Sequence, residues 1–163
     1  MDSKTDMQIR RAEISDVEVI AEFNCGIARE TEQIELLPDV IRAGVTALIK
    51  NPSYGFYVLA EVDRAVVGSL MITTEWSDWR NGMFWWVQSV YVRETHRRQG
   101  VYRAMYEHVR QLAKQNGGVC GFRLYVEHEN HRAQQTYTAL GMQQTPYRMF
   151  EDLQSSVRYC ENS

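Results

Sequence analysis

The chain has 163 residues, a formal net charge of −3 and a sequence pI near 5.8, and 44% of its residues are hydrophobic while 24% are charged. These values are typical of one globular domain that is long enough to bury a sizeable core. They provide no general electrostatic attraction to nucleic acid or to an anionic membrane, so neither is expected as a partner.

The cysteines and the first residues indicate in which cellular compartment the protein is expected. Cys25, Cys120 and Cys160 are an odd number without metal-ligand spacing, and there is no Cys/His cluster, so no metal site is expected. The first residues, MDSKTDMQ, include no apolar signal core, and no later run reaches membrane-spanning length. We therefore expect a cytoplasmic protein with reduced thiols.

The first elements predicted along the chain are a strand over residues 7–12 and two helices. Ser15 with Glu18 three residues later forms a capping-box pattern, and apolar residues follow at helical spacing. A second helix begins at Pro38, because proline suits the first helical turn, and its apolar positions continue to Ile49. The connection between the two helices, RETEQIE, is acidic, and such a charge run is most often a solvated face.

Two β-rich runs, residues 54–62 and 66–74, are separated by a short turn and are expected to pair antiparallel. The next connection, EWSDWRNG, combines two tryptophans with two carboxylates and a turn-forming Asn-Gly pair. Trp76 and Trp79 either pin this loop or form the wall of a site for a cationic ligand, because aromatic faces suit both roles.

Residues 84–92 are apolar on both faces of the two-residue alternation, which predicts a central strand buried on both sides. Gln88 is the one amide in that strand and needs hydrogen-bond partners there. From Val101 the apolar residues recur at helical spacing, so strand becomes helix across a basic turn. Helix N-termini favour anions, and Arg97 and Arg98 therefore indicate a bound polyanion whose atoms approach the backbone at Gly100. The alternative is a solvated basic turn.

After this helix, the sequence predicts a strand over residues 122–126 and one more helix. Asn130 can cap that helix and Gly141 can end it, which explains both residues without any function. Residues 142–153 are expected to form two short strands across Thr145-Pro146, followed by a loose polar tail.

The stretch VQSVYVRETHRRQGVYRAMYEHV resembles the central motif of the GNAT N-acetyltransferase superfamily, in which a strand ending in V-x-V leads through a basic [QR]-x-x-G-x-[GA] turn into a helix. A second motif of the superfamily, N-x-x-A-x-x-x-Y-x-x-x-G-[FM], matches from Asn130 through Tyr137 to Met142. The chain departs from the first motif at Tyr102, where Gly or Ala is usual, and we expect this side chain to point away from the ligand. Gln88 stands near a position where many members carry a catalytic carboxylate.

The resemblance implies one α/β domain over residues 7–153, with short tails at 1–6 and 154–163. Its fold would be a mixed, mostly antiparallel sheet of six to seven strands with about four helices. It implies direct transfer of an acetyl group from acetyl-CoA to a primary amine of a small molecule, and homodimers are common in the superfamily. The alternatives are a protein N-acetyltransferase, a non-catalytic acyl-CoA-binding sensor, or a phosphate-binding module for another nucleotide.

The motif positions assign the roles of Tyr137 and the cofactor contacts, whereas the candidate bases and substrate contacts come from the acidic link, the tryptophan-rich connection and the central strand. Tyr137 would lie near the cofactor sulfur and protonate the departing thiolate, and Glu32 and Glu75, with Glu30, are the candidates for the base. Substrate contacts are expected from Glu30, Glu32, Trp76, Trp79 and Gln88. Cofactor contacts are expected from Val90, Tyr91, Val92, Arg97, Arg98, Gln99, Gly100, Val101, Tyr102, Arg103 and Asn130.

Overall fold

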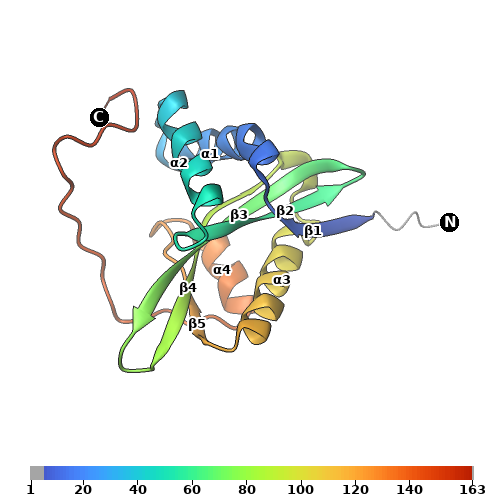
Figure 1. Ribbon diagram of the computed structural model, residues 1–163, viewed down its shortest axis with the longest axis vertical. Helices are drawn as coiled ribbons and strands as arrows, with labels where there is room; N and C mark the ends of the chain where they lie inside the picture. The colour runs from blue at the N-terminus through green and yellow to red at the C-terminus, as the bar shows by residue number, and fades with distance from the viewer. Residues whose placement is uncertain (1–5, 163) are drawn as a thin grey trace.

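The structure, a computed structural model, describes residues 6–162, so residues 1–5 and 163 of the expected tails lie outside the described part. One five-stranded sheet runs through the domain in the order β1-β2-β3-β4-β5 (Figure 1). Its first three pairings are antiparallel, and β4 pairs with β5 in parallel. The strands are β1 (Met7–Arg11), β2 (Gly55–Val62), β3 (Ala65–Ser77), β4 (Gly82–Val92) and β5 (Val119–Arg123).

Four helices flank this sheet, as the sequence predicts, and two short 3-10 turns accompany them (Figure 1). The described part of the chain has no helix with the length and apolar character that a membrane crossing requires. The helices are α1 (Val17–Glu32), α2 (Pro38–Lys50), α3 (Val101–Asn116) and α4 (His131–Ala139), and the turns are η1 (Ile14–Asp16) and η2 (Glu94–His96).

Alternate residues of β2 explain how the sheet is covered on both faces. Tyr57 and Leu59 pack with Ile20 of α1 on one face, whereas Val58 packs with Val109 of α3 on the other. Successive side chains of a strand point to opposite faces, so a run that is apolar at every position needs a helical layer on each side. The sequence predicts burial on both sides for residues 84–92 in β4, and in the structure β2 is covered by helices on both faces as well.

Both hairpins of the sheet turn through left-handed backbone. Asp63 and Arg64 join β2 to β3 with φ of 51° and 68°, values typical of the tight turns that match strand twist. The second hairpin differs from the expected tryptophan-rich loop. Strand β3 continues to Ser77, so Glu75 and Trp76 pair across the sheet with β4 and only residues 78–81 form the turn.

The start of α1 is also different from the prediction. Helix α1 begins at Val17, and the capping box forms one turn earlier, between Glu13 and Asp16 around η1. The backbone N–H of Glu13 donates to Asp16 Oδ2 at 2.7 Å, and Arg10 donates to both oxygens of Asp16 at 2.8 and 2.9 Å. Asp16 forms the cap because strand β1 places Arg10 beside it, a contact that the local Ser15 pattern does not reveal.

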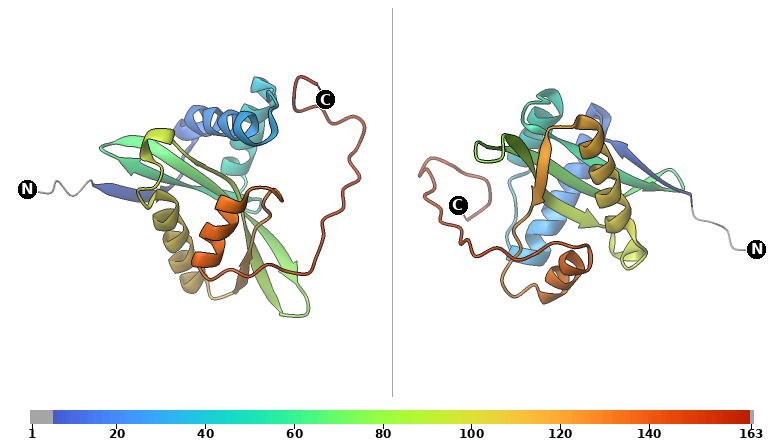
Figure 2. Two further views of the ribbon diagram at one scale, coloured as in Figure 1. Left: turned by 180° about the vertical axis from the view of Figure 1, so that it is seen from behind. Right: turned by 90° about the horizontal axis from the view of Figure 1, so that it is seen from below.

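The prediction of six to seven strands is wrong, because the sheet has five strands within residues 6–162. Residues 142–153 form no strand, and the strand expected at 122–126 forms at Val119–Arg123 instead. A strand needs a hydrogen-bonded neighbour. After α4 the chain runs outside the sheet and helices instead of lying beside β5 (Figures 1 and 2), and it returns to the domain only at an antiparallel bridge between Leu36 and Cys160.

Candidate active site

Strand β4 contains a bulge in the middle of the predicted strand. Ser89 has a φ of 50°, and the pairing register between β3 and β4 shifts at this point. The bulge lets both Val87 and Val90 pack toward α3, while Tyr91 turns to the other face and stacks on Phe23 of α1 at 4.8 Å between ring centroids. Bulges redirect side chains and are over-represented next to active sites.

Beyond the bulge, β4 has an open edge. Strand β5 pairs with β4 only from Met83 to Trp86. Within residues 6–162, no strand pairs with residues 87–92 on that side, so their N–H and C=O groups face an open edge. Such an edge can receive a ligand that carries amide groups of its own.

The N-terminus of α3 follows this open edge. Gly100 is the N-cap residue with φ of 77°, a left-handed conformation that favours glycine, and no side chain caps the first turn. That turn contains no acidic residue. The N–H groups at the start of α3 therefore carry the positive end of the helix dipole without an internal anion to balance it.

A hollow of about 520 Å³ opens at this helix terminus. Arg98, Arg103 and Arg132 line it, and none of the three forms an ion pair with any residue that the structure describes. The positive charge of the hollow is therefore available to an anionic ligand. The remaining lining residues are Val92, His96, Arg97, Gly100, Val101, Tyr102, Thr136, Ala139 and Leu140.

Arg132 is a site residue that the sequence prediction missed. It lies in the first turn of α4, where a cation opposes the helix dipole. The same argument singled out Arg97 and Arg98 at the start of α3, and applied to the helix after Asn130 it would have found Arg132 as well.

Arg97 has a different environment from its neighbours. Its Nη2 donates to both oxygens of Glu30 at 2.9 Å, and its Nε donates to the carbonyl oxygen of Val92 at 2.9 Å. The hydrogen bond with Glu30 raises the pKa of the Arg97 guanidinium. Arg97 thus connects the end of α1 to the end of β4, and Glu30 is already bound to it.

Tyr102 and Tyr137 meet between α3 and α4. The Tyr102 ring stacks on Tyr106 at 6.1 Å and meets the edge of the Tyr137 ring at 5.9 Å, and it also lines the hollow. Its hydroxyl is buried without a hydrogen-bond partner in the described chain. Burial raises the pKa of both Tyr102 and Tyr137, so both phenols stay protonated at neutral pH.

Gln88 has partners on two sides. Its Nε2 donates to Thr73 Oγ1 at 2.5 Å, and its Oε1 accepts from the Tyr125 hydroxyl at 3.4 Å. The Tyr125 ring also lies 6.1 Å from the ring of Trp86. These groups form a wall on the face of β4 that α1 covers. Tyr125 is not among the predicted site residues, and it lies in the segment where the sequence predicts a strand, residues 122–126.

Several other predicted site residues lie away from the hollow. Glu75 is bound by Arg123, and Trp76 pairs with Met83 near the β3–β4 turn, roughly 30 Å along the strand from Val92 at about 3.3 Å per residue. Trp79 lies in that turn and is 87% exposed.

Three further predicted residues, at the end of α1, at the start of α4 and in the basic turn, do not line the hollow. Glu32 is exposed at the last position of α1. Asn130 caps α4, its Oδ1 accepting from the N–H of Ala133 at 3.2 Å. The side chain of Gln99 donates to the carbonyl of Thr95 at 3.0 Å.

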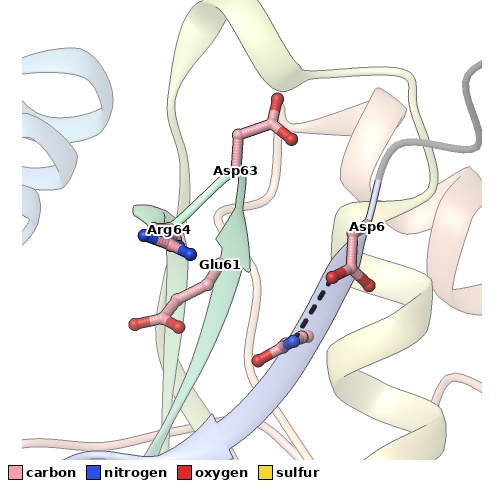
Figure 3. A pocket seen from close by; sticks show the side chains of 5 residues that line it. Asp6, Glu61, Asp63 and Arg64 are labelled. Atoms are coloured by element: carbon pink, nitrogen blue, oxygen red, sulfur yellow. Dashed lines mark hydrogen bonds between the residues drawn. The ribbon is translucent and has the colours of Figure 1, made fainter.

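A second hollow of about 450 Å³ lies over β1 and β2, two strands away from β4 (Figure 3). Asp6, Glu61 and Asp63 line it with Arg64 and Gln8, so its lining is mainly acidic. It contains none of the residues that the sequence singled out, and its charge is opposite to that of the hollow at α3.

Comparisons with known proteins identify the family. The family model described as Acetyltransferase (GNAT) family matches residues 11–142, which is most of the chain. The chain belongs to the GNAT acetyltransferase family. It is therefore an acetyl-CoA-dependent acetyltransferase, as the two sequence motifs indicated. A search of curated proteins found no match.

Solved structures agree with this membership. A possible acetyltransferase from Clostridium difficile 630 is 41% identical, with a TM-score of 0.84 over 90% of this chain and 97% of that one. The aminoglycoside N-acetyltransferase AAC(6')-Iy in complex with CoA is 16% identical, with a TM-score of 0.75 over 94% and 98% of the two chains. A ribosomal-protein-alanine N-acetyltransferase from Brucella melitensis biovar Abortus 2308 is 14% identical, with a TM-score of 0.73 over 92% and 100%. The latter two share the GNAT fold while their names state different acceptors.

Proposed function

We propose that this GNAT enzyme transfers the acetyl group of acetyl-CoA to a primary amine of a small molecule, with residues 7–153 as the catalytic domain. One observation carries the proposal. The uncapped N-terminus of α3 borders a hollow in which Arg98, Arg103 and Arg132 have no ion-pair partner among residues 6–162. A ligand with several phosphate groups matches that charge.

Each part of acetyl-CoA has residues of this chain that suit it, from the pyrophosphate to the pantetheine chain. The N–H groups at the start of α3, from Val101 to Arg103, would hold the pyrophosphate, and the unpaired arginines would bind the remaining negative charge. The open edge of β4 at Val90 and Val92 would pair with the amides of the pantetheine chain. Arg97 would act indirectly, because its hydrogen bond to Val92 holds the strand end beside the turn.

The chemistry requires the amine and the thioester to be held side by side. Acetyl-CoA supplies the thioester, whose carbonyl carbon bonds to the amine nitrogen as the C–S bond breaks. A backbone N–H at the β4 bulge would stabilise the charge that develops on the carbonyl oxygen. The Tyr137 hydroxyl would give its proton to the departing thiolate, and its raised pKa keeps that proton in place until then.

The attacking amine must lose a proton to a base. Glu32 and Glu75 remain the candidate carboxylates, but Glu75 is bound to Arg123 and Glu32 is exposed at the end of α1. Their placement favours removal of the proton through water that reaches a carboxylate at the surface. The wall formed by Trp86, Gln88 and Tyr125 would contact the acceptor, since aromatic faces and an amide oxygen suit an ammonium group before it is deprotonated.

A calorimetric titration tests the cofactor half of the proposal. Purified protein is titrated with acetyl-CoA, and then with inorganic phosphate and adenosine nucleotides as competitors. We expect acetyl-CoA to bind and the competitors to bind far more weakly. No binding of acetyl-CoA to folded protein would contradict the proposal.

An acceptor panel tests the second half. Small amines, aminoglycosides, and peptides with free N-termini or lysines are compared by the release of CoA thiol. Turnover with a small amine supports the proposal, whereas turnover confined to peptides would replace it with protein acetylation.

A further inference from the structure

Four side chains join α1 to the end of β4 through a series of stacking contacts. The rings of Phe23 and Tyr91 lie 4.8 Å apart at an interplanar angle of 28°. The guanidinium of Arg93 lies over Phe23, 4.9 Å from the ring centroid, and the guanidinium of Arg97 lies over Tyr91 at 5.5 Å. Guanidinium groups are attracted to aromatic faces, so each ring contacts a cation as well as the other ring. We call these four residues the α1–β4 stack.

Both arginines of the stack also bind α1 and the backbone of the sheet. Arg93 donates to Glu22 Oε1 at 3.1 Å and to the carbonyl of Val66 at 3.1 Å. Arg97 likewise binds one carboxylate of α1 and one backbone carbonyl. Exposed ion pairs stabilise little by themselves, but these hydrogen bonds fix where each guanidinium lies. The stack therefore connects α1 to the sheet at two points.

Gly26 of α1 provides the space for the ring of Tyr91. A Cβ at Gly26 would lie 2.9 Å from Cε2 and 3.2 Å from Cζ of that ring. Glycine inside a helix is unfavourable compared with alanine, and the close approach of the ring explains why it stands here. Glu22, Gly26 and Glu30 follow one another four residues apart, which places them on one face of α1. That face is the one that the stack contacts.

The stack depends on the bulge in β4. Side chains of a strand alternate between its two faces, so without the extra residue at the bulge the ring of Tyr91 would point toward α3. Ser89 has a φ of 50°, which is unfavourable for a residue with a Cβ, so surrounding contacts must stabilise the bulge. The contacts of Tyr91 with Phe23 and Gly26 form only in the bulged register, and they therefore stabilise it.

We propose that Phe23, Gly26 and Tyr91 are positioning residues for acetyl transfer, because their contacts fix the bulge whose backbone N–H faces the thioester oxygen. This inference rests on the proposed function, in which that N–H stabilises the charge developing on the oxygen. None of the three residues lines the hollow at α3, so they act through the backbone of β4. A donor aimed at a developing charge is effective only when it is held rigidly in place.

Gly26→Ala tests the proposal without removing a contact. The added Cβ would push on the ring of Tyr91, which Phe23 and Arg97 hold in place. We expect kcat to fall roughly tenfold or more while the Kd for CoA stays within about threefold, because the affected interaction forms in the transition state. Rates are measured by CoA release, with the amine of the acceptor panel that is turned over fastest. Gly44→Ala in α2 is the matched control and should keep the wild-type kcat, because nothing lies within 4 Å of the Cβ that it adds.

Variants of Tyr91 show whether the ring carries the effect. Tyr91→Leu should lower kcat roughly tenfold, and Tyr91→Phe, which keeps the ring, should restore most of that loss. In the Tyr91→Leu background, Gly26→Ala should lower kcat no further, because the ring that its Cβ meets is absent. A wild-type kcat for Gly26→Ala, or losses that multiply in the double variant, would overturn the proposal.

Hydrogen exchange separates this inference from the proposed function. Just after β4, the N–H of Arg93 donates to the carbonyl of Val67 at 2.8 Å. In Gly26→Ala and Tyr91→Leu this amide should exchange roughly tenfold faster than in the wild type, as measured by NMR, and Gly44→Ala should leave it unchanged. An unchanged rate in the first two variants would mean that the stack does not hold the strand end, which also overturns the proposal. If the wild type acetylates no amine, the proposed function fails, while the exchange rates still decide whether the stack fixes β4.

Discussion

Arg97 Nη2 donates to both carboxylate oxygens of Glu30 at 2.9 Å, across 67 residues of sequence. The same guanidinium donates through Nε to the carbonyl of Val92. Arg98, the next residue, has no such partner in the described chain and lines the hollow. Two adjacent arginines of one motif therefore have different roles, one structural and one available to a ligand.

Replacing each arginine by alanine should separate these roles. Arg97→Ala should lower the free energy of unfolding by roughly 1 kcal/mol, because it removes the hydrogen bond to Val92 and a partly exposed ion pair. Arg98→Ala should leave stability unchanged and weaken acetyl-CoA binding about tenfold, less so at high salt. Denaturant unfolding and calorimetry measure the two effects, and the opposite pattern would contradict the assignment.

Tyr137→Phe should lower turnover about 100-fold while the Kd for acetyl-CoA stays unchanged, because only the proton donor is lost. The protonated phenol is the acid, and burial raises its pKa above the ordinary tyrosine value of about 10, so wild-type activity should persist past pH 10 and decline only as the pH rises through the raised pKa. The phenylalanine variant should lack that alkaline decline. Steady-state rates of thiol release across this pH range decide the point, and equal turnover would remove Tyr137 from the mechanism.

Tyr102 should contribute to the stability of the fold through its ring and not through its hydroxyl. Tyr102→Phe removes a buried hydroxyl that has no partner, so the free energy of unfolding should stay the same or rise by up to about 1 kcal/mol. Tyr102→Ala should cost about 3 kcal/mol, because it leaves a cavity beside Tyr106 and Tyr137. Urea unfolding of both variants tests this. A clear loss of stability in the phenylalanine variant would mean that the hydroxyl is engaged.

Asp16→Asn should destabilise the domain by about 2 to 3 kcal/mol, because Arg10 loses a buried charged partner and the single amide oxygen can no longer accept from both guanidinium nitrogens and the N–H of Glu13. Arg10 lowers the pKa of Asp16. The stability from this pair is therefore present above about pH 4 and lost as the pH falls through the lowered pKa, so the variant should have a flatter acid limb. Glu18→Gln, which breaks only the exposed pair with Arg42, serves as the control and should cost less than about 1 kcal/mol.

Tyr57 should make the protein sensitive to high pH. Burial raises its pKa to about 12, whereas an unfolded tyrosine ionises near pH 10. The folded state therefore holds the proton more tightly, and roughly 2 to 3 kcal/mol of stability should be lost between pH 10 and 12. Thermal melts across this range should show a shallower loss for Tyr57→Phe, and Tyr54→Phe, at an exposed site, should behave like the wild type.

The sequence alone was sufficient for features that depend on near neighbours. The continuous apolar run at residues 84–92 predicted a strand buried on both sides, and Pro38 and Gly117 mark helix ends because backbone conformation restricts which residues can stand there. The basic turn before α3 was found in the same way, from two cations and Gly100 at a helix start. Together with the Asn130 to Met142 motif, these local signals predicted the family.

Only the tertiary structure decided which of the singled-out residues share a site. In the structure, Arg97 pairs with Glu30 and Arg132 lines the hollow. Trp76 and Trp79 lie at the β3–β4 hairpin, away from the hollow. The tertiary structure also left residues 142–153 without a partner strand, although their sequence favours one. The physical reason is that conformational preference acts over a few residues, whereas ion pairs, register shifts and strand partners depend on groups that only folding brings together.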